Sequence, residues 1–379
     1  MKVFMFSSVH PWNDSRIYFK QAKSLAKHGY KVQLVAIESE GINTIEENSN
    51  LKIQLLPRSK RRIHRPLRWM KLFILAFKSK ADIYHFHDPE LLPVGFLLKV
   101  ILNKKVVYDI HEDFPASIIT KSWIPLKIRN PLSKLLNRIE LYLSNFMNAL
   151  VFAEAYYKER FSEINRPLKL DVLNYPLKTL SDRNILIRRS NNISLVYAGA
   201  ISRERGILEM TEAFCILKKD NPNISFNIIG EISEDLIKEI DEIFCKFNLT
   251  RDGFYLRGRI SLDKVYEYYS QSQIGLCILH PVPNYTRSLA TKLFEYMSTG
   301  LAIVASNFDD WRMLIEDANC GLVVDPYDVR EVVAKIQFLI DNPSLIELYG
   351  KNGRSEYERK YNWDEEEAKL INLYQRLLV

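Results

Sequence analysis

The chain has 379 residues, of which 47% are hydrophobic and 26% are charged. This length is too great for one ordinary core and suits two domains, and the composition excludes a disordered polymer. The formal net charge is +7, but residues 1–180 carry 29 basic and 16 acidic side chains, whereas the remainder carries 24 and 30. We therefore expect a basic first domain and an acidic second domain with different partners.

The cysteines and the apolar runs argue against several classes of protein. Four cysteines lie far apart and form no CxxC pair, which is typical of reduced thiols in a cytoplasmic protein and not of a zinc site. The N-terminus lacks the small-residue cleavage site of a signal peptide and predicts a first strand. The longest apolar runs, 69–77 and 91–102, are shorter than the roughly 20 residues that cross a bilayer.

Short apolar strands alternate with helical patterns along most of the chain. The predicted strands are 3–8, 31–37, 51–56, 82–87, 105–110, 149–153, 193–199, 224–230, 253–258, 273–279, 302–306 and 321–324. The polar stretch 174–193 interrupts them and is the expected linker. The pattern predicts an α/β protein with two doubly wound, Rossmann-like domains, 1–177 and 190–360, that face each other across a cleft. The last helix, in 361–379, is expected to pack back on the first domain.

Polar residues gather where the predicted strands of the first domain end, which is where doubly wound sheets bind ligands. They are His10, Asp14, Arg16, His87, Asp88, His111 and Asp113. A single histidine of this kind is more often a hydrogen-bonded structural residue. Three at one sheet edge favour a site that binds hydroxyl groups or takes up a proton.

In the second domain, the first strand ends in YAGAISRERG (197–206). Gly199 permits a tight turn, and Arg203 and Arg205 stand before the next helix. Backbone N–H groups and a cation in this order suit a phosphate. The segment contains neither the GxGxxG dinucleotide fingerprint nor the GxxxxGK[ST] phosphate loop, so neither NAD binding nor ATP hydrolysis is favoured.

The helix start in NYTRSLATKLFEYMSTG (284–300) lacks the acidic residues that helix dipoles favour there, and Arg287 and Lys292 stand in their place. Thr291, Lys292 and Glu295 can share one helix face. A diphosphate at the helix start with a ribose on Glu295 would fit a nucleoside diphosphate. The alternative is that Lys292 and Glu295 form an ordinary surface ion pair.

Two basic segments, 58–80 and 121–143, contain amphipathic patterns. In 121–143 five apolar residues share one helical face: Leu132, Leu135, Leu136, Ile139 and Leu143. Such segments either bind an anionic membrane surface or form a solvated charged face over a core helix. Nucleic acid is disfavoured because no recognition motif is present.

These motifs together resemble the retaining GT-B glycosyltransferases of family 4, the glycosyl transferases group 1, which use nucleotide-activated sugars. The segment KLFEYMSTGLAIVAS (292–306) is similar to the family's E-x-M-x-x-G-x-P-V pattern, with support from YAGAISRERG, FYLRGRISLDKVYEYYSQSQIGL and GLVVDPYDVREVVAKI. HPWNDSRIYFKQAKSLAKHGYKV, YHFHDPELLPVG and VVYDIHEDFP resemble a branch that builds bacterial surface polysaccharides. The resemblance covers nearly the whole chain.

The resemblance implies that His111 faces the transferred sugar and that Glu295 binds the donor ribose, and these are the expected catalytic residues. Arg205 would replace the family's phosphate-binding lysine, and segment 257–260 would line the nucleobase pocket. The expected donor-binding residues are Gly199, Arg203, Arg205, Arg257, Gly258, Arg287, Thr291, Lys292, Leu293 and Glu295. The expected acceptor-side residues are His10, Asp14, Arg16, His87, Asp88 and Asp113.

The chain also departs from the family pattern. Ala200 stands where the family commonly has an arginine, and Arg287 stands where it has an earlier glutamate. Ala302 replaces the proline, and PWND replaces the glycine-rich first loop. Arg203 or Arg287 could offset the loss of the phosphate contact, and the Arg287 change affects how the hydroxyls of the donor sugar are read.

The resemblance implies a hexosyltransferase-type enzyme (EC 2.4) that transfers sugar from a nucleoside diphosphate sugar, UDP favoured over GDP, to a saccharide or polyprenyl-linked acceptor. No DxD-type carboxylate pair is found near the motifs, so we expect no metal and no other cofactor. The expected location is the cytoplasm, with peripheral contact to the inner face of the cytoplasmic membrane. The alternatives are a sugar-nucleotide epimerase or hydrolase and a non-catalytic sugar-nucleotide-binding subunit.

Overall fold

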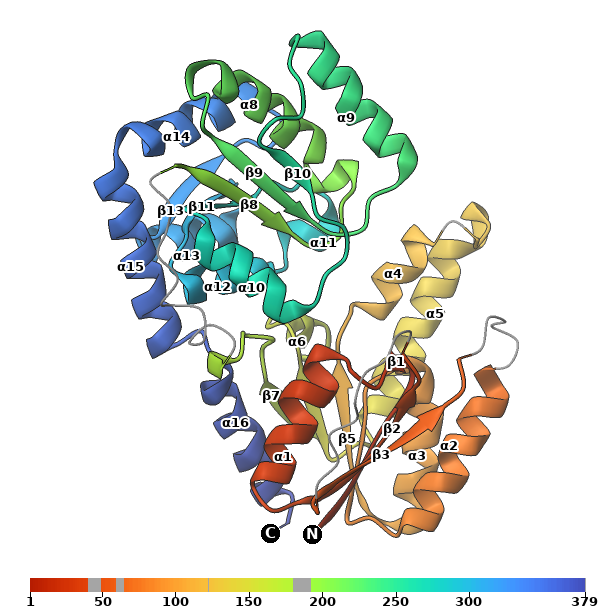
Figure 1. Ribbon diagram of the computed structural model, residues 1–379. Helices are drawn as coiled ribbons and strands as arrows, with labels where there is room; N and C mark the ends of the chain where they lie inside the picture. The colour runs from red at the N-terminus through yellow and green to blue at the C-terminus, as the bar shows by residue number, and fades with distance from the viewer. Residues whose placement is uncertain (40–48, 59–64, 122, 180–191, 379) are drawn as a thin grey trace. The chain divides into compact units, whose positions relative to one another are not determined.

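The computed structural model in Figure 1 describes residues 1–39, 49–58, 65–121, 123–179 and 192–378. The chain forms two compact units: Met1–Asn174 together with Glu365–Val379, and Tyr175–Asp364. Most of the expected linker (180–191) and part of the first basic segment (59–64) lie outside the described residues.

The first unit contains a sheet of seven parallel strands in the order β3-β2-β1-β4-β5-β6-β7. The strands are β1 (Lys2–Pro11), β2 (Lys31–Ile37), β3 (Leu51–Leu56), β4 (Ile83–Phe86), β5 (Lys105–Ile110), β6 (Ala149–Phe152) and β7 (Leu168–Asp171). The first six match expected strands. The seventh was not predicted, because it is a four-residue edge strand whose side chains are all only partly buried.

The helices of the first unit follow from their local sequences. They are η1 (Ser15–Ala22), α1 (Lys23–Lys27), α2 (Arg65–Ser79), η3 (Pro89–Leu91), α3 (Leu92–Leu102), α4 (Phe114–Thr120), α5 (Leu126–Ser144), α6 (Tyr157–Arg160) and α16 (Trp363–Arg376). The expected helix at 16–28 begins as the π-helix η1, and the Asp14 carboxylate caps it by accepting from the N–H groups of Arg16 and Ile17. In α16, Glu367 accepts a hydrogen bond from the Ser24 hydroxyl of α1.

The second unit contains six parallel strands in the order β10-β9-β8-β11-β12-β13. The strands are β8 (Ser194–Ala198), β9 (Ser225–Ile229), β10 (Phe254–Leu256), β11 (Ile274–Cys277), β12 (Ala302–Ser306) and β13 (Gly321–Val324). The helices are η4 (Arg203–Arg205), α8 (Ile207–Asp220), α9 (Glu234–Lys246), α10 (Leu262–Gln271), α11 (Pro283–Thr286), α12 (Thr291–Thr299), α13 (Asp309–Asp317), α14 (Val329–Asp341) and α15 (Pro343–Arg359). The expectation of two doubly wound parallel sheets is confirmed.

Both sheets change winding direction at their centre, between β1 and β4 and between β8 and β11. Ligands of doubly wound sheets bind beyond the carboxyl ends of the strands at such switch points. None of the described helices is both long enough and apolar enough to cross a bilayer.

Close packing of α12 on the sheet depends on Gly275 of β11. A methyl group at this position would lie 2.5 to 2.8 Å from ring atoms of Tyr296, which is fully buried in α12. The Tyr296 hydroxyl donates to the Leu276 carbonyl at 2.9 Å and so ties the ring to the same strand. The missing side chain at 275 therefore sets how closely α12 approaches β11.

We predict that Gly275→Ala lowers the free energy of unfolding by about 1–3 kcal/mol, because overpacking forces a buried ring or the backbone to shift. Because the clash is with the Tyr296 ring, Gly275→Ala should cost less in a Tyr296→Leu background, by at least about 0.5 kcal/mol. Urea unfolding of the two single variants and the double variant measures this coupling. Strictly additive effects would contradict it.

Candidate functional site

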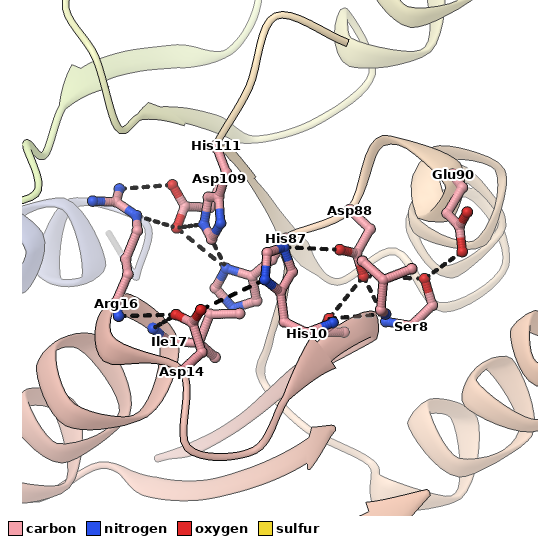
Figure 2. A network of polar contacts seen from close by, with 12 residues as sticks. Ser8, His10, Asp14, Arg16, Ile17, His87, Asp88, Glu90, Asp109 and His111 are labelled. Atoms are coloured by element: carbon pink, nitrogen blue, oxygen red, sulfur yellow. Dashed lines mark hydrogen bonds and ion pairs between the residues drawn. The ribbon is translucent and has the colours of Figure 1, made fainter. Parts of the chain in front are cut away.

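Four chemically active side chains of the first unit lie on one face of two neighbouring strands. His85 and His87 alternate along the end of β4, and Asp109 and His111 alternate along the end of β5. Residues two apart in a strand point to the same face. The parallel register pairs His85 with Val107, which brings His87 level with Asp109. Local strand geometry thus gathers the four groups, as Figure 2 shows for three of them.

Asp109 is the centre of this network. Its side chain is fully buried and accepts from Arg16 through both oxygens, Nη2 to Oδ1 at 2.8 Å and Nε to Oδ2 at 3.0 Å. Oδ2 also lies 2.7 Å from Gln21 Nε2 and 2.8 Å from His111 Nε2. Burial alone would raise the pKa of Asp109, but the charge of Arg16 and the hydrogen bonds from His111 and His87 hold it well below its usual value. The carboxylate is therefore ionised and fixed in place.

Two further histidines pack beneath this carboxylate as neutral rings. His87 Nδ1 lies 3.2 Å from Asp109 Oδ2, and the His87 ring stacks on His85 with centroids 4.7 Å apart. His85 Nδ1 lies 2.7 Å from the hydroxyl of Tyr374 in α16. Burial lowers the pKa of both histidines. One carboxylate thus balances one guanidinium here, and no further charge is needed.

His10 at the end of β1 sits between two carboxylates. Its Nδ1 is 3.5 Å from Asp14 and its Nε2 is 3.4 Å from Asp88, as Figure 2 shows. Burial alone would lower the pKa of His10, but the Asp14 hydrogen bond and the Asp88 charge raise it to about 9. His10 is therefore a cation near neutral pH. Its ring meets His111 edge-on, with centroids 5.3 Å apart.

The expected acceptor-side residues differ in burial. Arg16, His87 and Asp88 are at most 3% exposed and hydrogen-bond to other residues of the first unit. Asp88 accepts from the Ser7 and Ser8 hydroxyls and anchors the end of β1. The partly exposed residues at this edge are His10, Asp14, His111 and Asp113.

His85, His87 and Asp109 also place three possible metal-ligand atoms within 4.8 Å of one another. This group does not suit a metal ion, because the positively charged Arg16 already donates hydrogen bonds to both oxygens of Asp109. We therefore assign the cluster to hydrogen bonding.

In the second unit, two cations meet at the carboxyl end of β8. A methyl group at Gly199 (φ +141°) would lie 3.2 Å from Lys292 Nζ and 3.7 Å from Arg205 Nη1. Lys292 is 6% exposed and lies over the Tyr197 ring, and Arg205 lies over the Tyr285 ring. Among the described residues neither cation has a carboxylate partner. Two cations that contact only tyrosine rings and hydroxyls leave positive charge available to an anion.

Glu295 lies one turn beyond Lys292 on α12, as the sequence predicts. Its Oε2 accepts from the Tyr269 hydroxyl at 2.9 Å, which fixes one carboxylate oxygen. Thr291 is exposed at the start of α12, whose N-cap residue, Ala290, makes no side-chain hydrogen bond to the helix. Helix α12 thus carries the N–H groups of its first turn, the cation Lys292 and the carboxylate Glu295, and Arg205 of η4 lies near Lys292.

Five other expected donor residues differ in their contacts and burial. Arg203 pairs with Glu239 of α9 and is largely exposed, so it does not join Arg205. Arg257 donates to Asn227 at 3.0 Å and lies over the rings of Tyr255 and Tyr268. The Leu293 side chain is fully buried, and Arg287 is exposed after α11. Gly258, also exposed, accepts from the Gly230 N–H through its carbonyl.

Several residues of these sites were missed by sequence reasoning: His85, Asp109, Gln21, Tyr374, Tyr197 and Tyr269. One signal was available. The spacings His85-x-His87 and Asp109-x-His111 in neighbouring strands place polar groups on one face of an otherwise apolar sheet. The aromatic and amide partners carry no such signal, because their contacts join segments far apart in the chain.

Comparison with known families accounts for both units. The model of "Glycosyltransferase Family 4" matches residues 16–173, and the model of "Glycosyl transferases group 1" matches residues 179–356. An uncharacterised glycosyltransferase of Methanocaldococcus jannaschii is 24% identical over 336 residues, 82% of this chain and 79% of the relative. The capsular polysaccharide biosynthesis glycosyltransferase CapM of Staphylococcus aureus is 23% identical over 184 residues, 47% of this chain and 46% of CapM.

Solved structures share the fold over the full length. Sucrose-phosphate synthase from Thermosynechococcus elongatus aligns with a TM-score of 0.75 and 16% identity over 100% of this chain and 99% of the synthase. Anabaena HepE in complex with UDP aligns with a TM-score of 0.73 and 13% identity over 99% of this chain and 100% of HepE. The chain therefore belongs to the family 4 glycosyltransferases and has their GT-B-type α/β fold.

Proposed function

We propose that the protein is a retaining glycosyltransferase that moves a sugar from a nucleoside diphosphate sugar to a hydroxyl of a saccharide or lipid-linked saccharide. The observation that carries the proposal is the pair Lys292 and Arg205 beside Gly199, which lacks a carboxylate partner among the described residues. A diphosphate would supply the missing negative charge.

The chemistry of the donor suits this end of the second unit. Lys292, Arg205 and the N–H groups at the start of α12 would bind the diphosphate oxygens, and Glu295 would accept hydrogen bonds from the ribose hydroxyls. We favour UDP over GDP, since HepE structures hold UDP and UDP-glucose. Residues 190–360 would thus bind the donor, and residues 1–177 the acceptor.

The transfer step needs little from the protein beyond charge and position. The acceptor oxygen bonds to the anomeric carbon, the bond from that carbon to the phosphate oxygen breaks, and the hydroxyl proton passes to the leaving diphosphate. Attack and departure on the same face retain the configuration. The two cations stabilise the charge that develops on the leaving group, a role that needs no metal ion. By the family resemblance, His111 contacts the transferred sugar. The name of CapM supports surface-polysaccharide synthesis as the setting.

We predict that UDP raises the melting temperature of the protein, because a ligand of the native state stabilises it. Arg205→Ala should weaken UDP binding by about 10-fold to 100-fold, since a hydrogen bond to a charged group contributes about 1.5–3 kcal/mol. Arg203→Ala is the matched control, because Arg203 pairs with Glu239. Equal losses in the two variants would contradict the assigned site. Rapid breakdown of a UDP-sugar without acceptor would favour the hydrolase or epimerase alternative.

We further propose that the first unit contacts an anionic membrane surface through α2, α3, α4 and α5. Figure 1 shows α2, α3 and α5 side by side. These four helices expose thirteen large apolar side chains: Leu67, Met70, Ile74, Phe77, Leu97, Val100, Ile101, Ile119, Leu126, Ile128, Leu135, Ile139 and Tyr142. In α5, Leu135 and Ile139 of the predicted apolar face are exposed, while Ser133, Glu140 and Ser144 are buried. This pattern favours a binding surface over a core helix.

The charges of the same helices support that proposal. They contain nine basic residues and one acidic residue, Glu140. Glu140 is buried and accepts from Tyr108 and Arg160, so it does not oppose an anionic surface. Basic residues near such a surface contribute about 1 kcal/mol each. The location that we propose is the inner face of the cytoplasmic membrane, where a lipid-linked acceptor would be reached.

We predict that the protein sediments with phosphatidylglycerol vesicles at low salt and much less with phosphatidylcholine vesicles. Met70→Ser with Ile74→Ser should weaken sedimentation at least about tenfold, because each buried apolar side chain contributes about 1.5–3 kcal/mol. Phe338→Ser with Leu348→Ser in the second unit is the control, since both side chains are similarly exposed. Failure of the unchanged protein to sediment would leave these helices as a solvent-exposed face.

A further inference from the structure

The orientation of the His111 ring is set from within the first unit. Its Nε2 lies 2.8 Å from Asp109 Oδ2, whereas its Nδ1 has no hydrogen-bond partner among the described residues. The side chain is 13% exposed, so the ring has one edge against the core and one edge open. Which nitrogen carries the proton decides what the open edge offers to a ligand.

We infer that Asp109 is a positioning residue that holds the proton of His111 on Nε2, so that Nδ1 faces the substrate as a hydrogen-bond acceptor. An ionised carboxylate only accepts, so the His111 nitrogen nearest to it must donate. The bare nitrogen is then Nδ1, which suits a sugar hydroxyl as its donor. His111 would therefore accept a hydrogen bond from the substrate and not give one.

The Asp109 carboxylate is held in a fixed orientation. Arg16 donates two parallel hydrogen bonds to it, and the same guanidinium donates from Nη1 to the Val172 carbonyl at 2.7 Å. Gln21 Nε2 donates to Oδ2 from the next turn of η1. The three hydrogen bonds from Arg16 and Gln21 fix the carboxylate in an orientation that places Oδ2 within hydrogen-bond distance of His111.

His87 does not compete with His111 for contact with the substrate. His87 Nδ1 lies 3.3 Å from His111 Nε2, but both nitrogens face the same Asp109 oxygen, so each donates to that oxygen and neither accepts from the other. Donation from Nδ1 leaves His87 Nε2 without a proton, and that buried atom has no hydrogen-bond partner within the described part of the chain. His87 therefore braces the carboxylate and has no open edge.

The inference rests on the proposed function only for the identity of the group that meets Nδ1. The protonated nitrogen can be observed in the full chain without any turnover, in long-range ¹H–¹⁵N spectra of histidine-labelled protein. The His111→Gln spectrum assigns the His111 signals. We expect the Nε2–H form in the unchanged protein.

Asp109→Asn should lower the ratio of the Nε2–H to the Nδ1–H form at His111 by about tenfold or more, because hydrogen bonds to charged groups are the strong ones. Asp171→Asn, at the end of β7, removes a strand-end carboxylate that pairs with Lys158 and should leave the ratio unchanged. If Asp109→Asn does not fold because Arg16 is left buried and unpaired, Arg16→Met with Asp109→Asn removes both charges and gives the same readout.

An Nδ1–H form in the unchanged protein, or an unaltered ratio after loss of Asp109, would overturn the inference. With a sugar donor and acceptor, the folded Asp109 variant should lose at least about tenfold in kcat, while KM for the donor stays within about twofold, because only the histidine edge has changed. If the unchanged protein transfers no sugar but the ratio shifts as expected, the proposed function fails and the positioning role stands. An unchanged kcat with a shifted ratio would overturn the link to substrate.

Discussion

The buried carboxylate of Asp109 is the constraint on which the first unit depends. A charge with no access to water must be paired and hydrogen-bonded, and Arg16 meets that need. In doing so Arg16 ties η1, which follows β1, to β5 and to the Val172 carbonyl, just before the chain crosses to the second unit. Segments more than 150 residues apart are thus held together by one guanidinium group. The pair Arg16 and Asp109 also orients His111.

The second unit handles its buried charge in the opposite way. Lys292 lies almost fully buried against the Tyr197 ring, with Arg205 near it and no carboxylate from the described chain between them. Aromatic faces stabilise a cation less than a carboxylate does, so this charge is under-compensated. Glu295, one turn on, is held by Tyr269 and stays off the lysine. Folding has already removed water from Lys292, so an anion that binds here does not bear that desolvation cost.

Periodicity in the sequence predicts the two parallel sheets, because apolar strands buried on both faces separate helices along the whole chain. It predicts that Lys292 and Glu295 share a helix face, because that relation is local. It cannot distinguish Arg203 from Arg205, since a 3-10 turn sends one to Glu239 and the other to Tyr285. It cannot predict the partner of Asp109, which lies 93 residues away. In α5 it predicts an apolar face correctly but cannot say that the packed face is the one with Ser133 and Glu140.

The features that sequence periodicity does not predict have a common cause, and this cause is related to function. A local rule assumes that apolar side chains are covered, that buried charges are neutralised and that strand residues serve the core. The chain breaks each assumption in one place: the exposed apolar helices α2 to α5, the uncompensated pair Lys292 and Arg205, and Asp109 within β5. Folding alone favours none of the three, since each costs free energy in the isolated protein. Arg16 offsets the cost at Asp109 within the first unit, and a lipid surface and an anion are the partners that we propose for the other two places. The departures from folding rules therefore coincide with the sites for which we propose partners.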